Sequence, residues 1–388
     1  MRKIAVITGS RGDYSVYSSV LDAIDSLSGI EYELIVTGMH LSEKFGYTVS
    51  EIEKDKRKIF AKVPMLVNGD SLLGMTKNTG VAVIGIADVL ADLRPEVVLV
   101  LGDRGEQLAA ALAAAHMNIA VAHLHGGEVS GTIDESIRHA ISKFSHIHFA
   151  ATKKSRQRLI KLGEKEKDVY LVGAPGVDSV KKKGTMSREE VASYFGFDED
   201  KPIILAVLHP VTTEFDQAQN NTRHFIESLI EFKQQTACIY ANSDAGFSKM
   251  MGVIESRIIE SGMKNTIKLF KSLPHEVYLS TMKQTAVMAG NSSSGVIEAP
   301  SCRTPYVLVG TRQSGREKAE SILEADYNKD EILKALDKAL NDKEFRNVVN
   351  TCEKPYDPFN DANAGVRVAE ILSTLEITFN LLQKRIAY

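Results

Sequence analysis

The feature of this sequence that most limits its possible folds is a regular alternation of short apolar segments with amphipathic ones. Segments such as 3–12, 96–106 and 202–210 run through apolar residues without polar alternation, as strands of a parallel sheet buried on both faces do. Segments between them, for example 15–27 and 105–117, space their apolar residues by three and four, which is the period of a helix packed on one side. The alternation predicts βαβ units and an α/β fold.

The βαβ pattern occurs as two series, and a chain of 388 residues exceeds what one hydrophobic core usually supports. Residues 173–190, rich in glycine, lysine and turn-forming residues, have the character of a linker between the series. Because ligands of such sheets bind beyond the carboxyl ends of the strands, we expect a cleft between two Rossmann-like domains. The expected parts are an N-terminal domain (1–178), a C-terminal domain (186–360) and a last helical segment (361–388) that packs back on the first domain.

Composition excludes several classes of protein. A net charge of -3 gives no overall attraction to nucleic acid or to a membrane, so a bound anion must be held by a few placed cations. The most apolar stretch, 81–103, is interrupted by charged residues and a proline, which argues against a membrane span. Three scattered cysteines without a CxxC pair fit a reducing, cytoplasmic location and no structural disulfide or zinc site: Cys238, Cys302 and Cys352.

Two polar turns follow strands of the first series. Residues 8–15 (TGSRGDYS) place Arg11 where its guanidinium could bind phosphate oxygens, but match neither the dinucleotide fingerprint nor the phosphate-binding P-loop. A solvated arginine in an ordinary turn is the alternative. Asp103 and Arg104 end another apolar strand, and such charges must either neutralise each other or serve a ligand.

Residues 123–128 (HLHGGE) place two histidines and a glutamate around a tight turn. The two-residue spacing of His123 and His125 predicts that both lie on one face of a strand, with Glu128 just past the turn. These residue types can ligate metal, but their spacing matches no familiar zinc signature, so we expect no metal site. The other histidines of the region are expected to be packed or surface residues: His139, His146 and His148.

A helix is predicted to start directly after this turn. Thr132 and Glu135 fit a T-x-x-E capping box, which gives Glu135 a structural role. Asp134 lies in the first turn, and Arg138 lies one turn further on the same side. Because the helix start and the arginine both favour the ionised carboxylate, Asp134 suits a base or an electrostatic stabiliser.

The second series also ends its strands in polar residues. His209 and Asn242 each follow a strand, and Arg312 follows the last one. The serine-rich turn 292–295 leads into a short helix, where hydroxyl and N–H groups could face a phosphate, and Glu298 could accept from sugar hydroxyls. A purely structural turn is the alternative.

Five ordered segments carry a specific resemblance: 125–141, 209–214, 242–246, 290–298 and 310–317. In order and spacing they resemble the hydrolysing UDP-N-acetylglucosamine 2-epimerases of sialic acid biosynthesis, over nearly the entire chain. The resemblance implies a GT-B fold, no redox cofactor, and conversion of UDP-GlcNAc and water to N-acetylmannosamine and UDP. It also implies a homodimer or a dimer of dimers, associated through helices of the first domain.

The resemblance further implies roles for individual residues. The second domain would bind UDP, and the first would supply the acid and base groups Asp103, Glu128 and Asp134. His125 stands where eukaryotic bifunctional members and non-hydrolysing relatives have glutamate, so either His125 or Glu128 would be the second proton-transfer group. The arginines and His209 would also stabilise the negative charge of the departing UDP. The full set implied to bind UDP is Arg11, Arg104, His209, Asn242, Ser292, Ser293, Ser294, Gly295, Glu298 and Arg312.

Four other activities fit the same motifs. One keeps the reaction and changes the sugar to UDP-2,4-diacetamido-2,4,6-trideoxyglucose, on the way to legionaminic acid. The others are a non-hydrolysing epimerase, a GT-B glycosyltransferase that needs an acceptor, and a catalytically silent nucleotide-sugar sensor.

Overall fold

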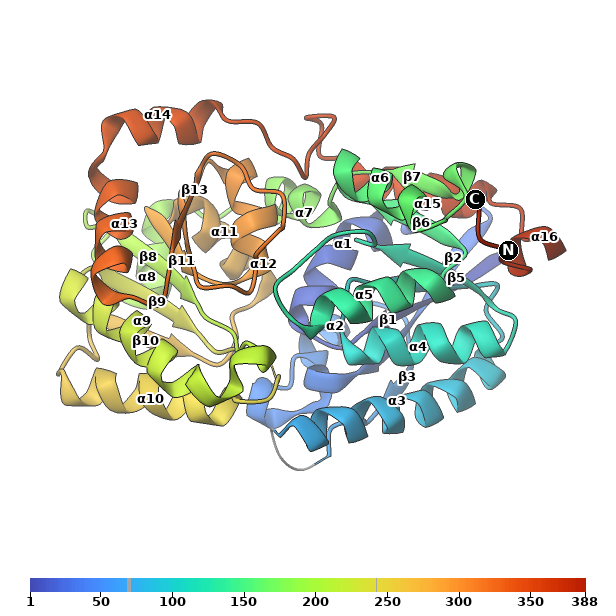
Figure 1. Ribbon diagram of the computed structural model, residues 1–388, viewed down its shortest axis with the longest axis horizontal. Helices are drawn as coiled ribbons and strands as arrows, with labels where there is room; N and C mark the ends of the chain where they lie inside the picture. The colour runs from blue at the N-terminus through green and yellow to red at the C-terminus, as the bar shows by residue number, and fades with distance from the viewer. Residues whose placement is uncertain (68–70, 242) are drawn as a thin grey trace. The chain divides into compact units, whose positions relative to one another are not determined.

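Two parallel sheets organise the chain, each in its own α/β unit (Figure 1). The computed structural model describes residues 1–67, 71–241 and 243–388. Unit 1 comprises Met1–Val129, Ile133–Ser179 and Tyr356–Tyr388, and unit 2 comprises Ser130–Thr132 and Val180–Pro355. The predicted α/β class with two Rossmann-like halves is confirmed.

Unit 1 has seven parallel strands in the order β3-β2-β1-β4-β5-β6-β7. Its elements are β1 (Arg2–Thr8), α1 (Arg11–Asp25), β2 (Ile30–Thr37), α2 (Val49–Lys54), β3 (Ile59–Val63), α3 (Leu72–Leu93), β4 (Val97–Leu101), α4 (Gly105–His116), β5 (Ala120–Leu124), α5 (Ile133–Phe144), β6 (Ile147–Ala150), α6 (Lys153–Lys161), β7 (Val169–Leu171), α15 (Ala364–Thr374) and α16 (Phe379–Leu382), with short 3-10 turns at Gly38–Leu41, Glu43–Phe45 and Glu166–Asp168.

The inner strand β1 shows how the sheet of unit 1 is buried on both faces. Ile4 and Val6 point into one core, which also contains residues of α1 and α15. Ala5 and Ile7 point into a second core, formed with α3 and α4. All four side chains are fully buried, and each large aliphatic one stabilises the fold by about 1.5–3 kcal/mol. The unalternating apolar pattern of the sequence therefore reflects two cores rather than one.

Unit 2 has six parallel strands in the order β10-β9-β8-β11-β12-β13. Its elements are α8 (Arg188–Phe195), β8 (Ile203–Val207), α9 (Ala218–Phe232), β9 (Gln235–Ile239), α10 (Phe247–Glu260), β10 (Ile267–Phe270), α11 (His275–Gln284), β11 (Val287–Gly290), α12 (Ser293–Ile297), β12 (Tyr306–Val309), β13 (Ile322–Ala325), α13 (Lys329–Asn341) and α14 (Lys343–Thr351), with 3-10 turns at Thr212–Gln217 and Ala299–Cys302.

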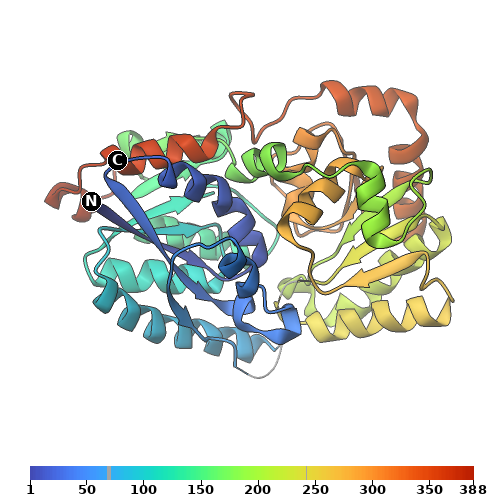
Figure 2. The same cartoon turned by 180° about the vertical axis from the view of Figure 1, so that it is seen from behind.

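The C-terminal helix returns to unit 1, as the sequence predicted. Helix α15 packs against α1, and Val368 and Leu372 enter the core of that face. Gly365 N–H donates to Asp178 Oδ2 at 2.7 Å, and the Arg2 guanidinium donates to the Leu372 carbonyl. Figure 2 shows this red helix on the same unit as the blue N-terminal segment.

The segment between the two series differs from its predicted linker character, because most of it is helical. Helix α7 (Pro175–Lys183) starts at a proline, whose fixed backbone angle suits the first helical position. Ser187 and Glu190 then form a reciprocal capping box at the start of α8. The boundary between the two units, at Ser179 and Val180, falls inside α7. None of the helices in the described part of the chain combines the length and apolar character needed to cross a bilayer.

Candidate functional site

Polar residues of unit 1 gather at the point where the strand order reverses. Strand β1 lies between β2 and β4, so the turns after β1 and β4 leave the sheet in opposite directions, and open α/β sheets bind their ligands at such a point. The turn after β1 leads into α1, which starts at Arg11. Its N-cap, Ser10, accepts from Asp13 N–H at 3.3 Å, and Asp13 Oδ2 accepts from Gly9 N–H at 3.0 Å. These bonds fix the turn from which α1 starts at Arg11.

Asp13 is a buried carboxyl group beneath this turn. Its burial, and next the nearby Glu106 carboxylate, raise the pKa of Asp13 to about 6. Gln107 ties this turn to the next one, because its side chain donates to the Ile7 carbonyl and accepts from Leu101 N–H, both at 3.1 Å. The ends of β1 and β4 are therefore held together by one buried amide.

The Asp103–Arg104 dipeptide lies in the turn after β4, and each side chain has another partner of opposite charge. Arg104 Nε donates to Glu106 Oε1 at 3.0 Å, and Asp103 forms an ion pair with Arg138 of α5. Arg138 is one of the largest fully buried side chains in the described residues. A buried arginine requires such a partner, because an uncompensated buried charge costs several kcal/mol.

His125 and Glu128 form a hydrogen-bonded pair after β5. His125 Nδ1 lies 2.6 Å from Glu128 Oε1, and both side chains are buried, with 9% and 2% of their surface exposed. His125 has a left-handed backbone with a φ of 61°, which is uncommon for a residue other than glycine and marks a constrained position. Among the described residues, none forms a hydrogen bond with the other ring nitrogen, His125 Nε2, although that atom is buried.

Arg138 and Tyr356 connect this pair to Asp103. Arg138 donates through Nη1 to the Glu128 carbonyl at 3.1 Å, while its Nη2 contacts Asp103. The Tyr356 hydroxyl donates to Glu128 Oε2 at 3.3 Å. Asp103, His125 and Glu128 are thereby brought together in unit 1, and Asp134 lies in the first turn of the helix that carries Arg138.

His123 has a different role from His125. Strand β5 ends at Leu124, so the two-residue alternation that placed both histidines on one face does not extend to His125. His123 Nε2 donates to the Gly102 carbonyl at 2.8 Å, and its Nδ1 is hydrogen-bonded to Ser142 Oγ at 3.1 Å. Burial lowers the pKa of His123 to about 3, so this ring is a neutral structural bridge. Within the described ranges, no group of three or more His, Cys, Asp or Glu side chains is arranged to hold a metal ion.

Unit 2 has its own reversal of strand order, between β8 and β11. The two turns there are joined by Asn291, whose Oδ1 accepts from His209 N–H at 2.6 Å and whose Nδ2 donates to the His209 carbonyl at 2.9 Å. Gln313 Nε2 and Arg312 Nη1 donate to the Asn291 carbonyl at 2.9 and 3.4 Å. His209, the serine-rich turn and Arg312 are therefore close together, although they come from three separate segments.

The serine-rich turn is held by hydroxyl contacts of its own. Ser292 caps α12, and its Oγ lies 2.9 Å from Ser294 Oγ, which lies 2.6 Å from the Tyr278 hydroxyl. Gly295 permits close packing, because a Cβ atom there would lie 2.4 Å from the Tyr306 ring. Glu298 follows α12 and is buried. Asn242, the remaining predicted residue of this unit, lies outside the described residues.

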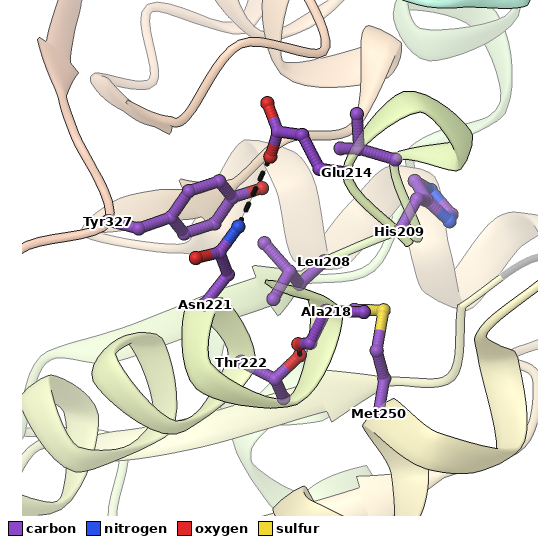
Figure 3. A pocket seen from close by; sticks show the side chains of 9 residues that line it. Leu208, His209, Glu214, Ala218, Asn221, Thr222, Met250 and Tyr327 are labelled. Carbon is purple, nitrogen blue, oxygen red and sulfur yellow. Dashed lines mark hydrogen bonds between the residues drawn. The ribbon is translucent and has the colours of Figure 1, made fainter. Parts of the chain in front are cut away.

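A small pocket of unit 2 opens beside His209 (Figure 3). Asn221 Nδ2 donates to Glu214 Oε2 at 3.1 Å on one side of it. Its other lining residues are mostly apolar: Leu208, Val211, Ala218, Thr222, Met250 and Tyr327. The pocket therefore adds an apolar wall to the polar turns around His209.

Three contacts of this site were not predicted from the sequence. Arg138 was expected beside Asp134, and no local pattern indicates its pairing with Asp103, 35 residues away. Tyr356 lies 228 residues from Glu128, at the point where the chain re-enters unit 1. Gln107 lies in a predicted helix, and its sequence context does not indicate that its side chain joins the turns after β1 and β4. Only the fold, which places the ends of β1, β4 and β5 at one edge, brings these residues to the site.

Comparisons with known proteins identify similar sequences and structures. A family described as UDP-N-acetylglucosamine 2-epimerase matches residues 22–373. The UDP-N,N'-diacetylbacillosamine 2-epimerase (hydrolyzing) of Legionella pneumophila is 39% identical over 388 residues, with both chains fully covered. The UDP-N-acetylglucosamine 2-epimerase of Neisseria meningitidis serogroup B is 32% identical, covering 99% of this chain and 98% of that protein.

A solved structure supports the fold independently. The crystal structure of UDP-GlcNAc 2-epimerase from Neisseria meningitidis bound to UDP-GlcNAc has a TM-score of 0.78 to this chain, at 19% sequence identity. The similarity covers 96% of this chain and 99% of that one. The predicted GT-B type of fold is thereby confirmed.

Proposed function

This chain belongs to the UDP-N-acetylglucosamine 2-epimerase family, as the sequence motifs predicted, and from this premise we propose that it is a hydrolysing 2-epimerase acting on a UDP-linked 2,4-diacetamido-2,4,6-trideoxyglucose. The products would be UDP and the free 2,4-diacetamido sugar with manno configuration at C-2. Water is the second substrate. The substrate assignment rests on the Legionella pneumophila relative, which is similar from end to end.

The proposed substrate is the one that the sequence motifs gave as the alternative. UDP-GlcNAc was the first expectation, and the diacetamido sugar was its alternative. The diacetylbacillosamine relative is 39% identical, whereas the UDP-N-acetylglucosamine relative is 32% identical at similar coverage. UDP-GlcNAc stays the second candidate, and it would yield N-acetylmannosamine by the same chemistry.

The observation that carries the chemical proposal is the His125–Glu128 pair. A carboxylate that holds one ring nitrogen of a histidine fixes the orientation and tautomer of the ring, so that the other nitrogen can transfer a proton. Glu128 holds Nδ1, and Nε2 is the buried nitrogen that forms no hydrogen bond within the described residues. We assign proton transfer at C-2 to His125 and the orienting role to Glu128, which Tyr356 steadies through its hydroxyl.

In the first half of the reaction, UDP leaves C-1 and the C-2 proton is removed. The C-2 proton is not acidic, because no carbonyl group is adjacent to that carbon. Departure of UDP must therefore build positive charge at C-1 before or while the C–H bond breaks, and the electron pair of that bond forms the C-1=C-2 double bond of a glycal. Fixed cations aimed at the leaving diphosphate would stabilise its charge by several kcal/mol. The proposed cations are Arg11, Arg104, His209 and Arg312.

In the second half, water adds to C-1 and a proton returns to C-2 on the opposite face. This step requires a second acid–base group, for which we propose Asp134. Asp103 is already held by Arg138, so we assign it the role of fixing the geometry around Glu128 and of contacting the sugar. General acid–base groups of this kind each contribute about 10² to 10⁴ in rate.

Unit 2 is the proposed UDP-binding unit. The turns after β8 and β11 are joined through Asn291, which makes a rigid rim out of residues that are distant in sequence. Glu298 would accept from ribose hydroxyls, and the turn after β11 would face the diphosphate. The full proposed set in this unit is His209, Asn242, Ser292, Ser293, Ser294, Gly295, Glu298 and Arg312.

We also propose that the protein is a homodimer joined through α3 of unit 1. This helix lies at the surface of the unit (Figure 1) and exposes four large aliphatic side chains, Leu72, Leu73, Val81 and Ile84, which are 53%, 63%, 39% and 69% exposed. Apolar side chains exposed together on one helix are typical of an interaction surface.

A comparison of the activity of the protein on the two UDP-sugars tests the substrate proposal. The purified protein is assayed for UDP release with UDP-N,N'-diacetylbacillosamine and with UDP-GlcNAc at matched concentrations. We expect a kcat/KM at least about tenfold higher for the diacetamido sugar, since a site built for a second acetamido group loses binding energy when that group is absent. A higher kcat/KM for UDP-GlcNAc would contradict the proposal and restore the second candidate.

A further inference from the structure

The C-terminal tail of the chain reaches the end of α5, the helix that carries Arg138 and Asp134. Lys384 Nζ donates to the carbonyl oxygens of Ser142, Lys143 and Ser145 at 2.8, 3.0 and 2.6 Å. These carbonyls lie at the C-terminal end of α5, where the last groups of a helix have no partner within the helix. A cation at this end also interacts favourably with the helix dipole. One lysine from the tail therefore caps the helix.

A buried acid holds Lys384 in this position. Lys384 Nζ lies 2.7 Å from Glu164 Oε2, and the Glu164 side chain is only 2% exposed. Glu164 also contacts His148 Nε2 at 3.0 Å and Lys143 Nζ at 2.8 Å. Burial alone would raise the pKa of Glu164, but the hydrogen bond from His148 and the two lysines outweigh it and lower the pKa to about 2. Glu164 is thus ionised at neutral pH and binds the lysine as a charged group.

The chain after Lys384 also contacts unit 1. Ala387 N–H donates to the Gly163 carbonyl at 2.9 Å, next to Glu164. Gly163 has a φ of 86°, and a Cβ atom there would lie 2.8 Å from the Tyr388 ring. The chain after Lys384 is therefore attached to unit 1 at Gly163, although Ile386 and Tyr388 are 57% and 94% exposed.

The capped end of α5 is connected to the proposed catalytic groups. The Oγ atom of Ser142, whose carbonyl Lys384 binds, lies 3.1 Å from both the Arg138 carbonyl oxygen and His123 Nδ1, so its single proton can be donated to either acceptor. Arg138 in turn contacts both Asp103 and the Glu128 carbonyl. A displacement of this helix end would therefore reach the groups that orient His125.

We infer that Lys384 is a positioning residue of the acid–base site, which acts by fixing α5 from its C-terminal end. The inference rests on the proposed function and extends it to the last five residues of the chain. Lys384 contacts the helix and not the reacting sugar, so it is expected to affect turnover through geometry rather than through UDP binding.

Three full-length proteins test this role: the unmodified chain, Lys384→Met and Arg385→Met. The first substitution keeps the length of the side chain and removes its donors, and the second removes a neighbouring exposed cation of the same tail. For Lys384→Met we expect kcat to fall by about tenfold to hundredfold, since small displacements of catalytic groups have effects of that size. We expect its KM and its affinity for UDP to stay near those of the unmodified chain, and its kcat–pH profile to shift. Arg385→Met should match the unmodified chain in each measurement.

Hydrogen exchange provides a readout that is independent of turnover. Amide protons of α5 should exchange faster in Lys384→Met than in the unmodified chain or in Arg385→Met. If Lys384→Met fails to fold, Lys384→Arg, which keeps the charge and donors, replaces it and should retain part of the activity while exchanging faster than the unmodified chain.

The outcomes separate this inference from the proposed function. An unmodified kcat, pH profile and α5 exchange rate in the folded Lys384→Met protein would overturn the inference, as would an equal loss of kcat in Arg385→Met. If the unmodified chain released UDP from neither sugar while α5 still exchanged faster in Lys384→Met, the proposed function would fail and the cap on α5 would stand.

Discussion

His125 and Glu128 are joined by a hydrogen bond of 2.6 Å between Nδ1 and Oε1, inside unit 1. The left-handed backbone of His125, with a φ of 61°, turns the chain directly after β5 and is held by a bond from His125 N–H to the Phe149 carbonyl at 3.1 Å. Glu128 follows three residues later, and its second carboxylate oxygen accepts a hydrogen bond from the Tyr356 hydroxyl. The strained turn thus serves to place an imidazole and a carboxylate side by side.

Removing the imidazole should abolish turnover while leaving the fold intact. Asparagine is the suitable replacement, because it tolerates the left-handed backbone better than most residues. We expect His125→Asn to lower kcat by about 10² to 10⁴, the usual contribution of a general base, with UDP binding unchanged by calorimetry. His116→Asn, at an exposed histidine of α4, serves as the control and should keep normal activity. Near-normal kcat in His125→Asn would refute the assignment.

Asp134 and its neighbour Glu135 should differ sharply in their effect on turnover. We expect Asp134→Asn to lower kcat by about 10² or more, since it removes the second acid–base group, while UDP still binds. Glu135 forms a pair with His139 at 3.6 Å, and we expect it to be structural, so Glu135→Gln should cost little activity. Steady-state kinetics of both variants under the same conditions make the comparison. Equal kcat values for the two variants would exclude the proposed role of Asp134.

Asp13 predicts a specific dependence of stability on pH. Its pKa is raised from the ordinary 3.8 to about 6, so between these values the folded state holds a proton that the unfolded state has lost. The contribution of Asp13 to the free energy of unfolding therefore falls as pH rises from about 4 to about 6. Above pH 6, its buried charge lowers the free energy of unfolding by a constant amount. Asp13→Asn should be more stable above pH 6, on the order of 2 kcal/mol, and nearly equal near pH 4.

Urea unfolding at pH 4 and pH 7.5 checks this prediction. Asp200→Asn, at an exposed position before β8, is the matched control and should change stability little at either pH. The same free-energy difference between Asp13→Asn and the unmodified chain at both pH values would show that burial of this charge is not the cause.

A charge on the apolar face of α3 should separate the proposed dimer. Ile84 is the most exposed of the four large aliphatic residues exposed on this helix, and an aspartate in a desolvated interface would be left without a partner. We expect the unmodified chain to sediment as a dimer and Ile84→Asp to sediment as a folded monomer. A monomeric unmodified chain, or a dimer that Ile84→Asp leaves unaffected, would contradict the α3 interface.

The inner strands were predictable from sequence, whereas two edge strands were not. Strands such as β4 are buried throughout, so they appear as unbroken apolar runs. The edge strands β3 and β13 are half exposed, and they carry Lys62 and Glu324. A strand of this kind has one solvated side and no continuous apolar run, so the pattern that identified the inner strands does not detect it.

The residues of the candidate site could be proposed from the sequence, whereas their contacts could not. Residues at strand ends, such as Asp103 and His209, were identified because parallel sheets place their sites there. The partners of Asp103 and Glu128 come from α5 and from Tyr356, which are distant in sequence. Such pairings depend on how helices pack on a sheet, so the spacing of residues within one segment does not predict them.

The most direct test of the account is the reaction of the purified protein with UDP-N,N'-diacetylbacillosamine in D₂O, followed by NMR. Abstraction of the C-2 proton and its return from solvent predict release of UDP and of a free manno-configured sugar that carries deuterium at C-2. A released sugar with hydrogen at C-2, or an epimerised sugar still attached to UDP, would contradict hydrolytic 2-epimerisation through a glycal.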